Sequence, residues 1–360
     1  MKRVFIFGYY GFQNIGDEAI LSAIVSTLRK YKKGIQISAL SYNAQYTEKL
    51  HGIRGVSRNS LRDIIQEIKG ADLVISGGGS LLQDVTSSRS LIYYLSIIYL
   101  AKKMGKKVMF YGNGFGPIVK PWNQYLLQRA IRQVDRITLR DHDSMAAFQT
   151  MGVNRNVEVT ADATFVLQPE KEGNILKLLK EQEIPVDKPL IGISVRPWKR
   201  DDSVVKVLSS VCDYIMDRNM NVVFLPMQFT KDLPLSEEIC KKMKNKGYIL
   251  KKPVNPKEMI GIIGKMDFLI GMRLHALIFA ARMAVPMIGI EYDPKIKGFL
   301  DIVGQTNIGK VEDLDFIKLC SEFDRLWANR ESAQIRLKET AGYLKDKAEI
   351  NGEIAIRLLE

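Results

Sequence analysis

Short runs of apolar residues alternate with helix-length amphipathic segments along most of the chain. In the first half, the apolar runs predict strands at residues 3–7, 36–40, 73–76, 107–111, 136–139 and 157–160. The segments between them predict helices at residues 17–31, 61–69, 90–104, 122–134 and 144–151. Nearly continuous apolar strands separated by amphipathic helices are typical of a parallel sheet covered on both faces. The pattern therefore predicts a doubly wound α/β fold.

A polar, Lys- and Glu-rich stretch at residues 168–188 interrupts this alternation, and prolines mark its end at Pro185 and Pro189. It predicts a linker, with a surface helix over residues 174–182. The alternation then resumes with strands expected at 190–195, 222–226, 248–250, 268–270 and 286–290. Helices are expected at 203–217, 235–246, 256–264 and 273–283, and from residue 313 onward.

Two similar α/β halves on either side of one linker predict a two-domain protein. We expect an N-terminal Rossmann-like domain at residues 1–170 and a linker at 171–188. A C-terminal Rossmann-like domain is expected at 189–330, followed by a helical tail at 331–360. Such a pair of domains is expected to face a cleft.

The charge of the chain narrows the classes of partner. The 360 residues include 53 Lys and Arg against 40 Asp and Glu, a net charge of +13, and residues 1–170 carry +9 of it. A basic half of this kind suits a nucleic acid, an anionic membrane surface or an acidic small substrate. No helix-turn-helix, RNP-type or zinc-finger pattern is present, and no basic stretch is interleaved with stacking aromatics, so we expect no nucleic-acid partner.

The remaining composition predicts a cytoplasmic protein with peripheral contact at the inner face of the cell membrane. The first residues read as a buried strand and not as a secretion signal. The longest apolar run, residues 91–101, is shorter than the ~20 residues that cross a bilayer. It is followed by two lysine pairs, at 102–103 and 106–107, which suit an anionic bilayer surface. Cys212, Cys240 and Cys320 are too scattered for a disulfide framework or a zinc site and are expected to be reduced thiols.

Three glycine-rich turns follow predicted strands of the first half, where α/β sheets bind ligands. The first, at residues 8–18, contains no GxGxxG pattern and no Walker lysine, so neither a Rossmann cofactor nor P-loop chemistry is supported. Asp17, at the start of the next helix, is interpreted either as an N-cap or as a general base. In the second turn Gly77, Gly78 and Gly79 remove every Cβ, which either serves tight packing or lets a ligand reach bare backbone N–H groups. The third turn covers residues 112–117.

Cations follow these turns at positions that suit an anionic ligand. Arg89 lies just after the triple glycine, and Arg140 lies at a strand end. A single arginine is usually a solvated surface residue. An arginine at a strand end, beside a glycine-lined edge, can also bind phosphate or carboxylate with two hydrogen bonds.

In the second half of the chain, the main candidates for catalysis and binding lie at the beginning of one predicted helix. Arg273 and His275 follow a strand directly and fall in the first turn of an apolar helix, where the helix dipole disfavours cations unless an anion binds. A histidine satisfied within the core is the alternative for His275. Lys295 and Lys297 follow the last predicted strand and are expected at the same edge.

Taken together, these segments resemble the polysaccharide pyruvyl transferase family, and within it the enzymes that modify secondary cell-wall polymers. The resemblance lies in GYYGFQNIGDEAI at 8–20, SGGGSLLQD at 76–84 with residues 86–90, and residues 112–117. It continues in RDHDS at 140–144, DAT at 162–164, GMRLHAL at 271–277 and EYDPKIK at 291–297. The segments run in order over about residues 1–300.

The resemblance implies a glycosyltransferase-B-like pair of Rossmann-type domains with the active site between them, and no obligatory metal or organic cofactor. The donor would be phosphoenolpyruvate. The acceptor would be N-acetylmannosamine in a lipid-linked precursor, which receives a 4,6-linked pyruvate ketal while phosphate is released. The family's polymers anchor surface-layer proteins.

Motif positions of the family fall on Asp17, Arg140, His275 and Lys295. In the chemistry implied, His275 is the candidate acid and Asp17 the candidate base, because ketal formation protonates a methylene carbon and deprotonates a sugar hydroxyl. Further candidates for substrate binding complete the set: Arg273, Lys297, Arg89, Arg58, Gly77, Gly78, Gly79 and Asn14.

Two rival functions stay open on the sequence. The same scaffold could carry a glycosyltransferase with a nucleotide-sugar donor, or a binding module that senses an acidic metabolite. The acceptor's identity and linkage, the ketal stereochemistry and the oligomeric state are set by features that one sequence does not reveal.

Overall fold

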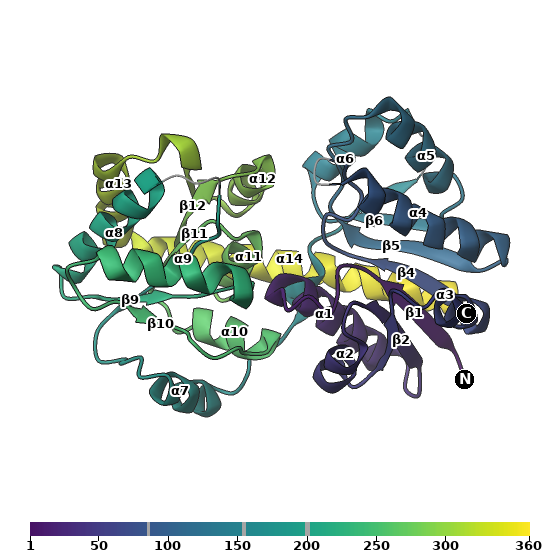
Figure 1. Ribbon diagram of the computed structural model, residues 1–360, viewed down its shortest axis with the longest axis horizontal. Helices are drawn as coiled ribbons and strands as arrows, with labels where there is room; N and C mark the ends of the chain where they lie inside the picture. Colours follow the sequence, from purple (N-terminus) through teal and green to yellow (C-terminus); the bar gives the residue numbers. More distant parts are fainter. Residues whose placement is uncertain (85–86, 153–155, 199–201) are drawn as a thin grey trace. The chain divides into compact units, whose positions relative to one another are not determined.

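The computed structural model describes residues 1–84, 87–152, 156–198 and 202–360, and its contacts divide the chain into two compact units. Unit 1 comprises Met1–Leu167 together with Leu344–Glu360, and unit 2 comprises Gln168–Tyr343. The boundary between the two ranges near the C-terminus falls inside one long helix, α14 (Arg330–Leu359; Figure 1). Thr86, which contributes to the family resemblance, lies outside the described residues.

The described residues of unit 1 form a seven-stranded parallel sheet in the order β3-β2-β1-β4-β5-β6-β7. Val4 of β1 pairs with Ile37 on one side and with Leu73 on the other, so the first strand is central. The six strands predicted for this half are confirmed, with shifts of one or two residues at some ends. The strands are β1 (Arg3–Phe7), β2 (Gln36–Ser41), β3 (Arg54–Ser57), β4 (Leu73–Gly77), β5 (Lys107–Asn113), β6 (Arg136–Leu139) and β7 (Val157–Val159).

Helices cover the sheet of unit 1, and their apolar positions explain the packing. In α3, Ile64 and Ile68 are four residues apart on one helix face and are both buried, while Ser60 caps the helix by accepting from Asp63 N–H. Their core also contains buried residues of α4 and α5 and of β1 and β5. The helices are α1 (Ile15–Tyr31), α2 (Ala44–His51), α3 (Leu61–Gly70), α4 (Ser88–Lys103), α5 (Pro121–Ile131), α6 (His142–Gln149) and the short 3-10 helix η1 (Ala163–Val166).

The described part of unit 2 repeats the plan with a six-stranded parallel sheet in the order β10-β9-β8-β11-β12-β13. Its strands are β8 (Leu190–Ser194), β9 (Asn221–Phe224), β10 (Tyr248–Ile249), β11 (Phe268–Gly271), β12 (Met287–Glu291) and β13 (Thr306–Lys310). Its helices are α7 (Glu172–Glu181), α8 (Asp202–Met216), α9 (Phe229–Lys242), α10 (Pro256–Ile263), α11 (Leu274–Arg282), α12 (Pro294–Val303), the 3-10 helix η2 (Val311–Asp313) and α13 (Phe316–Ala328). Burial raises the pKa of the Cys240 and Cys320 thiols to about 11, so both are protonated at neutral pH.

Several elements were missed or placed wrongly by the sequence pattern. The edge strands β3 and β13 each bury a single residue, Val56 and Ile308, and so leave no apolar run to detect. The prediction that the helix after β9 starts at Leu235 is wrong, because α9 already begins at Phe229 and contains Pro234. By contrast, the helix predicted at 174–182 within the linker segment is confirmed as α7, which begins two residues earlier and packs against α10.

Asn351 fastens the last part of the chain to the sheet of unit 1. Its side chain is fully buried, and its Oδ1 lies 2.5 Å from Thr138 Oγ1 and 2.9 Å from Thr160 Oγ1. Its amide nitrogen donates to the Ala161 and Ala348 carbonyls. A residue 190 positions distant thus completes the polar pairing where β6 and β7 end.

We expect Asn351→Ala to lower the free energy of unfolding by about 2–4 kcal/mol, because it removes the four buried hydrogen bonds that this side chain makes. Denaturant unfolding checks this. Glu353→Ala, an exposed change on the same helix, is the matched control and is expected to stay within about 0.5 kcal/mol of the wild type. Equal effects of the two substitutions would show that Asn351 is not a fastening point.

Candidate active site

In each unit the loops that follow the strands gather at the carboxyl edge of a parallel sheet, the edge at which open α/β sheets bind ligands. In unit 1 this edge holds the glycine turns after β1, β4 and β5, and in unit 2 it holds the segments after β8, β11 and β12. The candidate residues are described below unit by unit.

Asn14 and Asp17 occupy different places at the start of α1. Asn14 is the N-cap, and its side chain accepts a hydrogen bond from Gly16 N–H at 3.2 Å. The interpretation of Asp17 as an N-cap is therefore wrong, since Asp17 lies three residues further along, in the first turn of the helix. The half-buried Asp17 carboxylate is stabilised there by the positive end of the helix dipole.

The Asp17 carboxylate lies between the second glycine turn and a group of tyrosines. A Cβ built on Gly79 would come 3.3 Å from Asp17 Oδ1. Burial raises the pKa of the Tyr9 and Tyr10 hydroxyls, and the negative charge of Asp17 raises both further. Both tyrosines therefore stay protonated at neutral pH, and the half-buried Tyr9 offers a hydroxyl group near this carboxylate.

The triple glycine turn has a packing explanation at two of its three positions. A Cβ on Gly77 would come 2.2 Å from the Tyr10 hydroxyl, which donates to the Gly77 carbonyl at 2.7 Å. A Cβ on Gly78, whose φ is +53°, would come 2.5 Å from the Ile20 side chain. Packing alone thus requires glycine at both places, and their contact with substrate stays a prediction.

Aromatic rings form a stack above the first turn, and Arg58 lies against it. Phe12 lies between Tyr9, at 4.0 Å between ring centres, and Tyr42, at 4.6 Å, with all three rings nearly parallel. Tyr42, at the end of the stack, is 60% exposed. The Arg58 guanidinium lies 5.4 Å from the Phe12 ring centre and 5.1 Å from that of Tyr93. We call Tyr9, Phe12, Tyr42 and Arg58 the aromatic platform.

Arg140 is held at the end of β6 beside the third glycine turn. Its side chain is 7% exposed, with Nε 3.1 Å from Asp141 Oδ2 and Nη1 3.6 Å from Asp162 Oδ2. A Cβ on Gly114 would come 2.9 Å from the guanidinium, so this glycine makes room for the arginine. The DAT motif thus supplies a carboxylate that orients Arg140.

A buried pair that sequence reasoning missed fixes the first turn. Glu18 is 1% exposed, and its Oε1 accepts from Gly11 N–H at 2.8 Å while its Oε2 lies 3.0 Å from His51 Nε2. The other ring nitrogen of His51 lies 3.0 Å from Ser22 Oγ. Gly11 has a φ of +79°, and a Cβ there would come 2.2 Å from Ser41 Oγ. In the sequence, His51 stands in a polar helix with no motif around it, so no signal marked it.

In unit 2, Arg273 is paired with a buried carboxylate. It is the N-cap residue of α11, and its Nε donates to Asp232 Oδ2 at 3.0 Å while its Nη2 contacts Asp232 Oδ1. Asp232 is fully buried and also accepts from the backbone N–H groups of Met227 and Gln228. This carboxylate compensates the charge of Arg273. The ion pair therefore links the start of α11 to the turn after β9 and stabilises this edge of the sheet.

His275 is the second residue of α11 and is half-buried, with its ring centre 6.2 Å from that of Phe279. Lys295 lies in the first turn of α12, 3.2 Å from Asp293 and 5.5 Å from the Tyr292 ring centre. Lys297, on the same helix, is 59% exposed and pairs with Asp301. Of the two lysines, Lys295 is the one held at the strand end.

Arg196, which sequence reasoning also missed, follows β8 at this edge. Its guanidinium lies 4.1 Å from the Tyr292 ring centre and 6.0 Å from that of Trp198. Its Nε is buried, and no hydrogen-bond acceptor for it occurs among the described residues. Arg196 and Lys295 thus both lie against the Tyr292 ring. The segment VRPW could have been noted as one more strand-end arginine.

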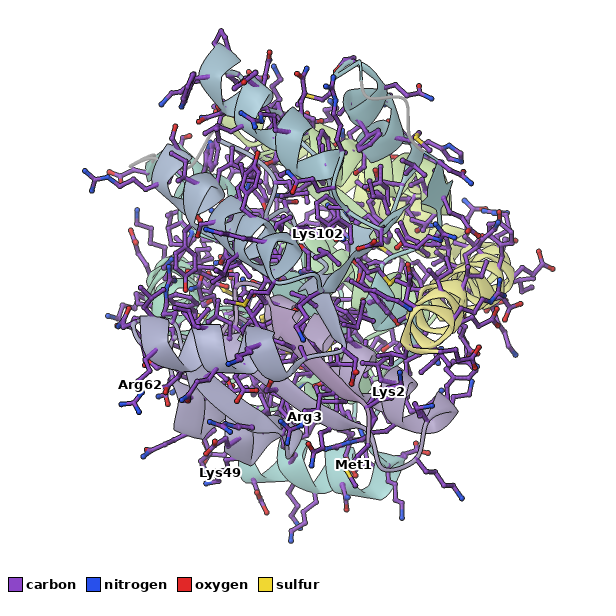
Figure 2. The ribbon with its side chains drawn as sticks, turned by 90° about the vertical axis from the view of Figure 1, so that its right-hand side faces the viewer. Met1, Lys2, Arg3, Lys49, Arg62 and Lys102 are labelled. Atoms are coloured by element: carbon purple, nitrogen blue, oxygen red, sulfur yellow. The ribbon has the colours of Figure 1, made fainter. Side chains whose placement is uncertain are left out.

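One candidate cation stands apart from the groups described so far, and one cavity lies at the opposite edge of the sheet of unit 1. Arg89 is exposed on the first turn of α4. A cavity of about 590 Å³ lies at the amino ends of β1 and β2, but its cations are satisfied locally, as Arg3 donates to Gln36 and Arg54 pairs with Glu67. Figure 2 shows Arg3 at this end of the sheet. Within the described ranges, no group of His, Cys, Asp and Glu side chains is arranged to hold a metal ion.

We expect His51→Ala to lower the free energy of unfolding by about 2–4 kcal/mol, because it leaves a buried oxygen of Glu18 without its partner. The check is chemical denaturation next to His142→Ala, which removes an exposed histidine of the same unit. If both variants unfold like the wild type, the Glu18–His51 pair does not hold the first turn.

Solved structures similar over nearly the whole chain share its fold at low sequence identity. The S. aureus MnaA–UDP structure superposes with a TM-score of 0.69 at 12% identity, covering 99% of this chain and 95% of that one. UDP-GlcNAc 2-epimerase from Neisseria meningitidis, bound to UDP-GlcNAc, gives 0.65 at 13% identity, with 99% and 100% covered. Anabaena Alr3699/HepE in complex with UDP-glucose gives 0.64 at 13% identity, with 99% of each chain covered. These similarities confirm the expected glycosyltransferase-B-like α/β fold.

A family model matches far more specifically. The model described as polysaccharide pyruvyl transferase matches residues 14–294, which include Asn14 and Asp17 at one end and extend to the residue before Lys295 at the other. The match covers well over half of the chain and spans the candidate residues of both units apart from Lys295, Lys297 and the beginning of the first turn. The chain belongs to the polysaccharide pyruvyl transferase family, a family of enzymes.

Proposed function

We propose that this enzyme is of the CsaB type, a cell-wall ketal-pyruvyl transferase. The donor is phosphoenolpyruvate, and the acceptor is N-acetylmannosamine in a lipid-linked precursor of a secondary cell-wall polysaccharide, met at the cytoplasmic face of the cell membrane. The product carries a 4,6-linked pyruvate ketal, and phosphate is released. The observation that carries the proposal is the set of cations beside His275 at the carboxyl edge of unit 2, in a chain of this family.

The donor is assigned to unit 2 because its carboxyl edge offers Arg196, whose buried Nε has no acceptor among the described residues. Phosphoenolpyruvate has a phosphate and a carboxylate, so it needs several cations and backbone donors. Lys295 and Arg196 flank Tyr292, and the start of α11 adds the positive end of a helix dipole. Arg273 contributes by holding this edge together through Asp232.

The reaction needs one proton delivered and two hydroxyl protons removed. His275 gives a proton to the methylene carbon of phosphoenolpyruvate, which becomes the methyl group, and C2 becomes electrophilic. Asp17 takes the proton of the first sugar hydroxyl as its oxygen bonds to C2. The second hydroxyl oxygen then bonds to C2 as the C2–O bond to phosphate breaks, its proton passes to His275, which gave up its own in the first step, and the departing phosphate carries away the bonding electrons.

The acceptor sugar is assigned to unit 1, where Asp17 and two members of the aromatic platform, Tyr9 and Phe12, follow β1, and the other two follow the neighbouring strands β2 and β3. Flat rings bind the apolar C–H face of a hexose, while neighbouring hydroxyl and charged groups bind its oxygens. The space between Phe12, Tyr42, Arg58 and the adjoining tyrosines is too narrow for water. A sugar would therefore lie on the exposed rings and not between them. Arg140 is assigned to the anionic groups of the substrates.

The test is phosphate release from phosphoenolpyruvate with a panel of synthetic N-acetylhexosamine lipid diphosphates. We expect His275→Ala and Asp17→Asn each to lower kcat by roughly 10²–10⁴-fold, the usual contribution of a general acid or base, with unchanged thermal stability. Asp143→Asn, an exposed carboxylate of α6, is the control and is expected to keep wild-type activity.

Other outcomes of this experiment identify the rival functions. Stabilisation by uridine nucleotides but not by phosphoenolpyruvate would favour a nucleotide-sugar glycosyltransferase, the class suggested by the UDP-bound structures of similar fold. Binding of phosphoenolpyruvate with no phosphate release on any acceptor would favour a binding module. Wild-type activity of His275→Ala would remove histidine from the role of acid.

Arg196 gives a second, independent test. We expect Arg196→Met to raise the KM for phosphoenolpyruvate about tenfold or more, the effect of losing one hydrogen bond to a charged group, with the KM for the acceptor nearly unchanged. Arg218→Met is the matched control, because Arg218 also stacks on a tyrosine of unit 2, 3.4 Å from the Tyr214 ring centre, but pairs with Asp324. A rise in both KM values, or in neither, would contradict the assignment of Arg196 to the donor.

A further inference from the structure

Large apolar side chains are exposed together where α4 and α5 begin. Val119 is 67% exposed, Trp122 66%, Tyr125 47% and Ile92 45%. The rings of Trp122 and Tyr125 lie 5.7 Å apart, so they form one continuous surface on α5. We call these four residues the apolar patch. Exposed apolar groups gathered in this way mark an interaction surface.

The patch spans two helices that lie side by side (Figure 1). At their amino-terminal ends, Asn123 Nδ2 and Lys120 Nζ each donate to Ser88 Oγ, at 2.9 and 3.0 Å. Further along, the Tyr99 hydroxyl donates to the Leu126 carbonyl at 3.2 Å. Ile92 lies one helical turn after Ser88, so it belongs to the same end of the helix pair as Trp122.

A buried carboxylate holds the apolar patch outward. Asp84, 5% exposed, accepts from the backbone N–H groups of Val119 and Lys120 at 2.8 and 3.0 Å, and from Asn123 Nδ2 at 2.8 Å. Burial by itself raises the pKa of Asp84, but these hydrogen bonds together outweigh it and hold the pKa below its usual value. The segment before α5 is therefore fixed with Val119 and Trp122 in solvent.

The segment that carries the patch is strongly basic. Three of its cations adjoin the patch: Arg89 lies in the first turn of α4, Lys120 follows Val119, and Arg129 donates to the Tyr125 hydroxyl at 3.3 Å. The others lie further from it, along the two helices and at the starts of β5 and β6. Residues 87–136 contain nine Lys and Arg side chains and a single carboxylate, Asp135, which pairs with Lys102 at 2.7 Å. Figure 2 shows Lys102 at the carboxyl end of α4. The nine are Arg89, Lys102, Lys103, Lys106, Lys107, Lys120, Arg129, Arg132 and Arg136. Exposed tryptophan and tyrosine beside lysine and arginine are the combination that binds the headgroup region of anionic bilayers.

The patch also lies at the functional end of unit 1. A helix that follows a strand of a parallel sheet begins at the carboxyl edge, so α4 and α5 start beside the glycine turns after β4 and β5. None of the described helices is long and apolar enough to cross a membrane. Contact with a bilayer through the apolar patch would bring the carboxyl edge of this sheet to the lipid surface.

We propose that the apolar patch, with Arg89, Lys120 and Arg129 beside it, docks unit 1 on the surface of an anionic phospholipid bilayer. Val119, Trp122, Tyr125 and Ile92 enter the headgroup region, and the lysines and arginines attract the lipid phosphates. A nucleic acid fits this surface less well, because aliphatic Val119 and Ile92 offer no stacking face to a base. The proposal concerns membrane binding and holds whatever donor and acceptor the enzyme uses.

Co-sedimentation with large vesicles tests it on the full chain. We expect the wild type to bind vesicles that contain phosphatidylglycerol, to bind pure phosphatidylcholine vesicles much less, and to be released by high salt because exposed charges are screened. The double variant Val119→Ser/Trp122→Ser should bind about tenfold more weakly, since two large apolar side chains no longer leave water. Arg89→Gln/Arg129→Gln, which removes two exposed charges beside the patch, should weaken binding about fivefold for each charge.

The control is Ile317→Ser/Tyr343→Ser, which removes two exposed apolar side chains of unit 2 and should bind vesicles like the wild type. Circular dichroism and the thermal midpoint confirm that each variant is folded. Phosphate release with a water-soluble acceptor should be unchanged in the Val119/Trp122 variant, so a failure of the proposed chemistry and a failure of docking are separable.

Three results would overturn the proposal. They are no binding of the wild type to anionic vesicles, binding of the Val119/Trp122 variant equal to that of the control, or displacement of the bound protein by single-stranded RNA. The last result would instead identify the surface as a nucleic-acid site.

Discussion

Parallel strand pairing is the constraint on which the rest of the structure depends. Because every strand of a parallel sheet ends at the same edge, residues that are far apart in sequence are gathered there without any other device. Val4 pairs with both Ile37 and Leu73, and this places the turns after β1 and β4 next to each other. In unit 2, Ile193 pairs with both Phe224 and Ile270 in the same manner, so the segment with Arg196 adjoins the start of α11.

Buried carboxylates add to the backbone hydrogen bonds of the turns at these edges. Glu18 accepts from Gly11, Asp84 from Val119 and Lys120, and Asp232 from Met227 and Gln228. Each carboxylate also holds a side chain: His51, Asn123 and Arg273, respectively. Burying a charge without partners costs several kcal/mol, so each carboxylate fixes its turn in the one geometry that satisfies it. The turns are thereby kept ready for a ligand.

The sequence allowed the sheets and most helices to be predicted, because buried parallel strands are apolar runs and their helices are amphipathic. The edge strands β3 and β13 escaped because a strand that buries one residue leaves no such run. At the site, glycine turns and strand-end cations could be found from their spacing. The pairing of Arg273 with Asp232 could not, because 41 residues separate them and only the fold brings them together. His51 was missed for the same reason, since its significance lies in the contact with Glu18. Arg196 was overlooked, although it follows a predicted strand and could have been found like the other strand-end cations.

The cationic side chains behind the net charge of +13 fall into classes with different physical roles, according to what each one contacts. Arg140 and Arg273 face buried carboxylates, and such charges orient neighbouring groups more than they attract a distant ligand. Arg196 lies on aromatic rings without a described acceptor, and it keeps its attraction for an anion. The cations of α4 and α5 are mostly exposed. The attraction of such a charge is screened by salt within roughly 10 Å. Exposed cations therefore select a small ligand poorly, but a group of them attracts an extended anionic surface. A few partly buried cations therefore give specificity for an anionic ligand, while the larger exposed group favours a position of the protein at an anionic surface.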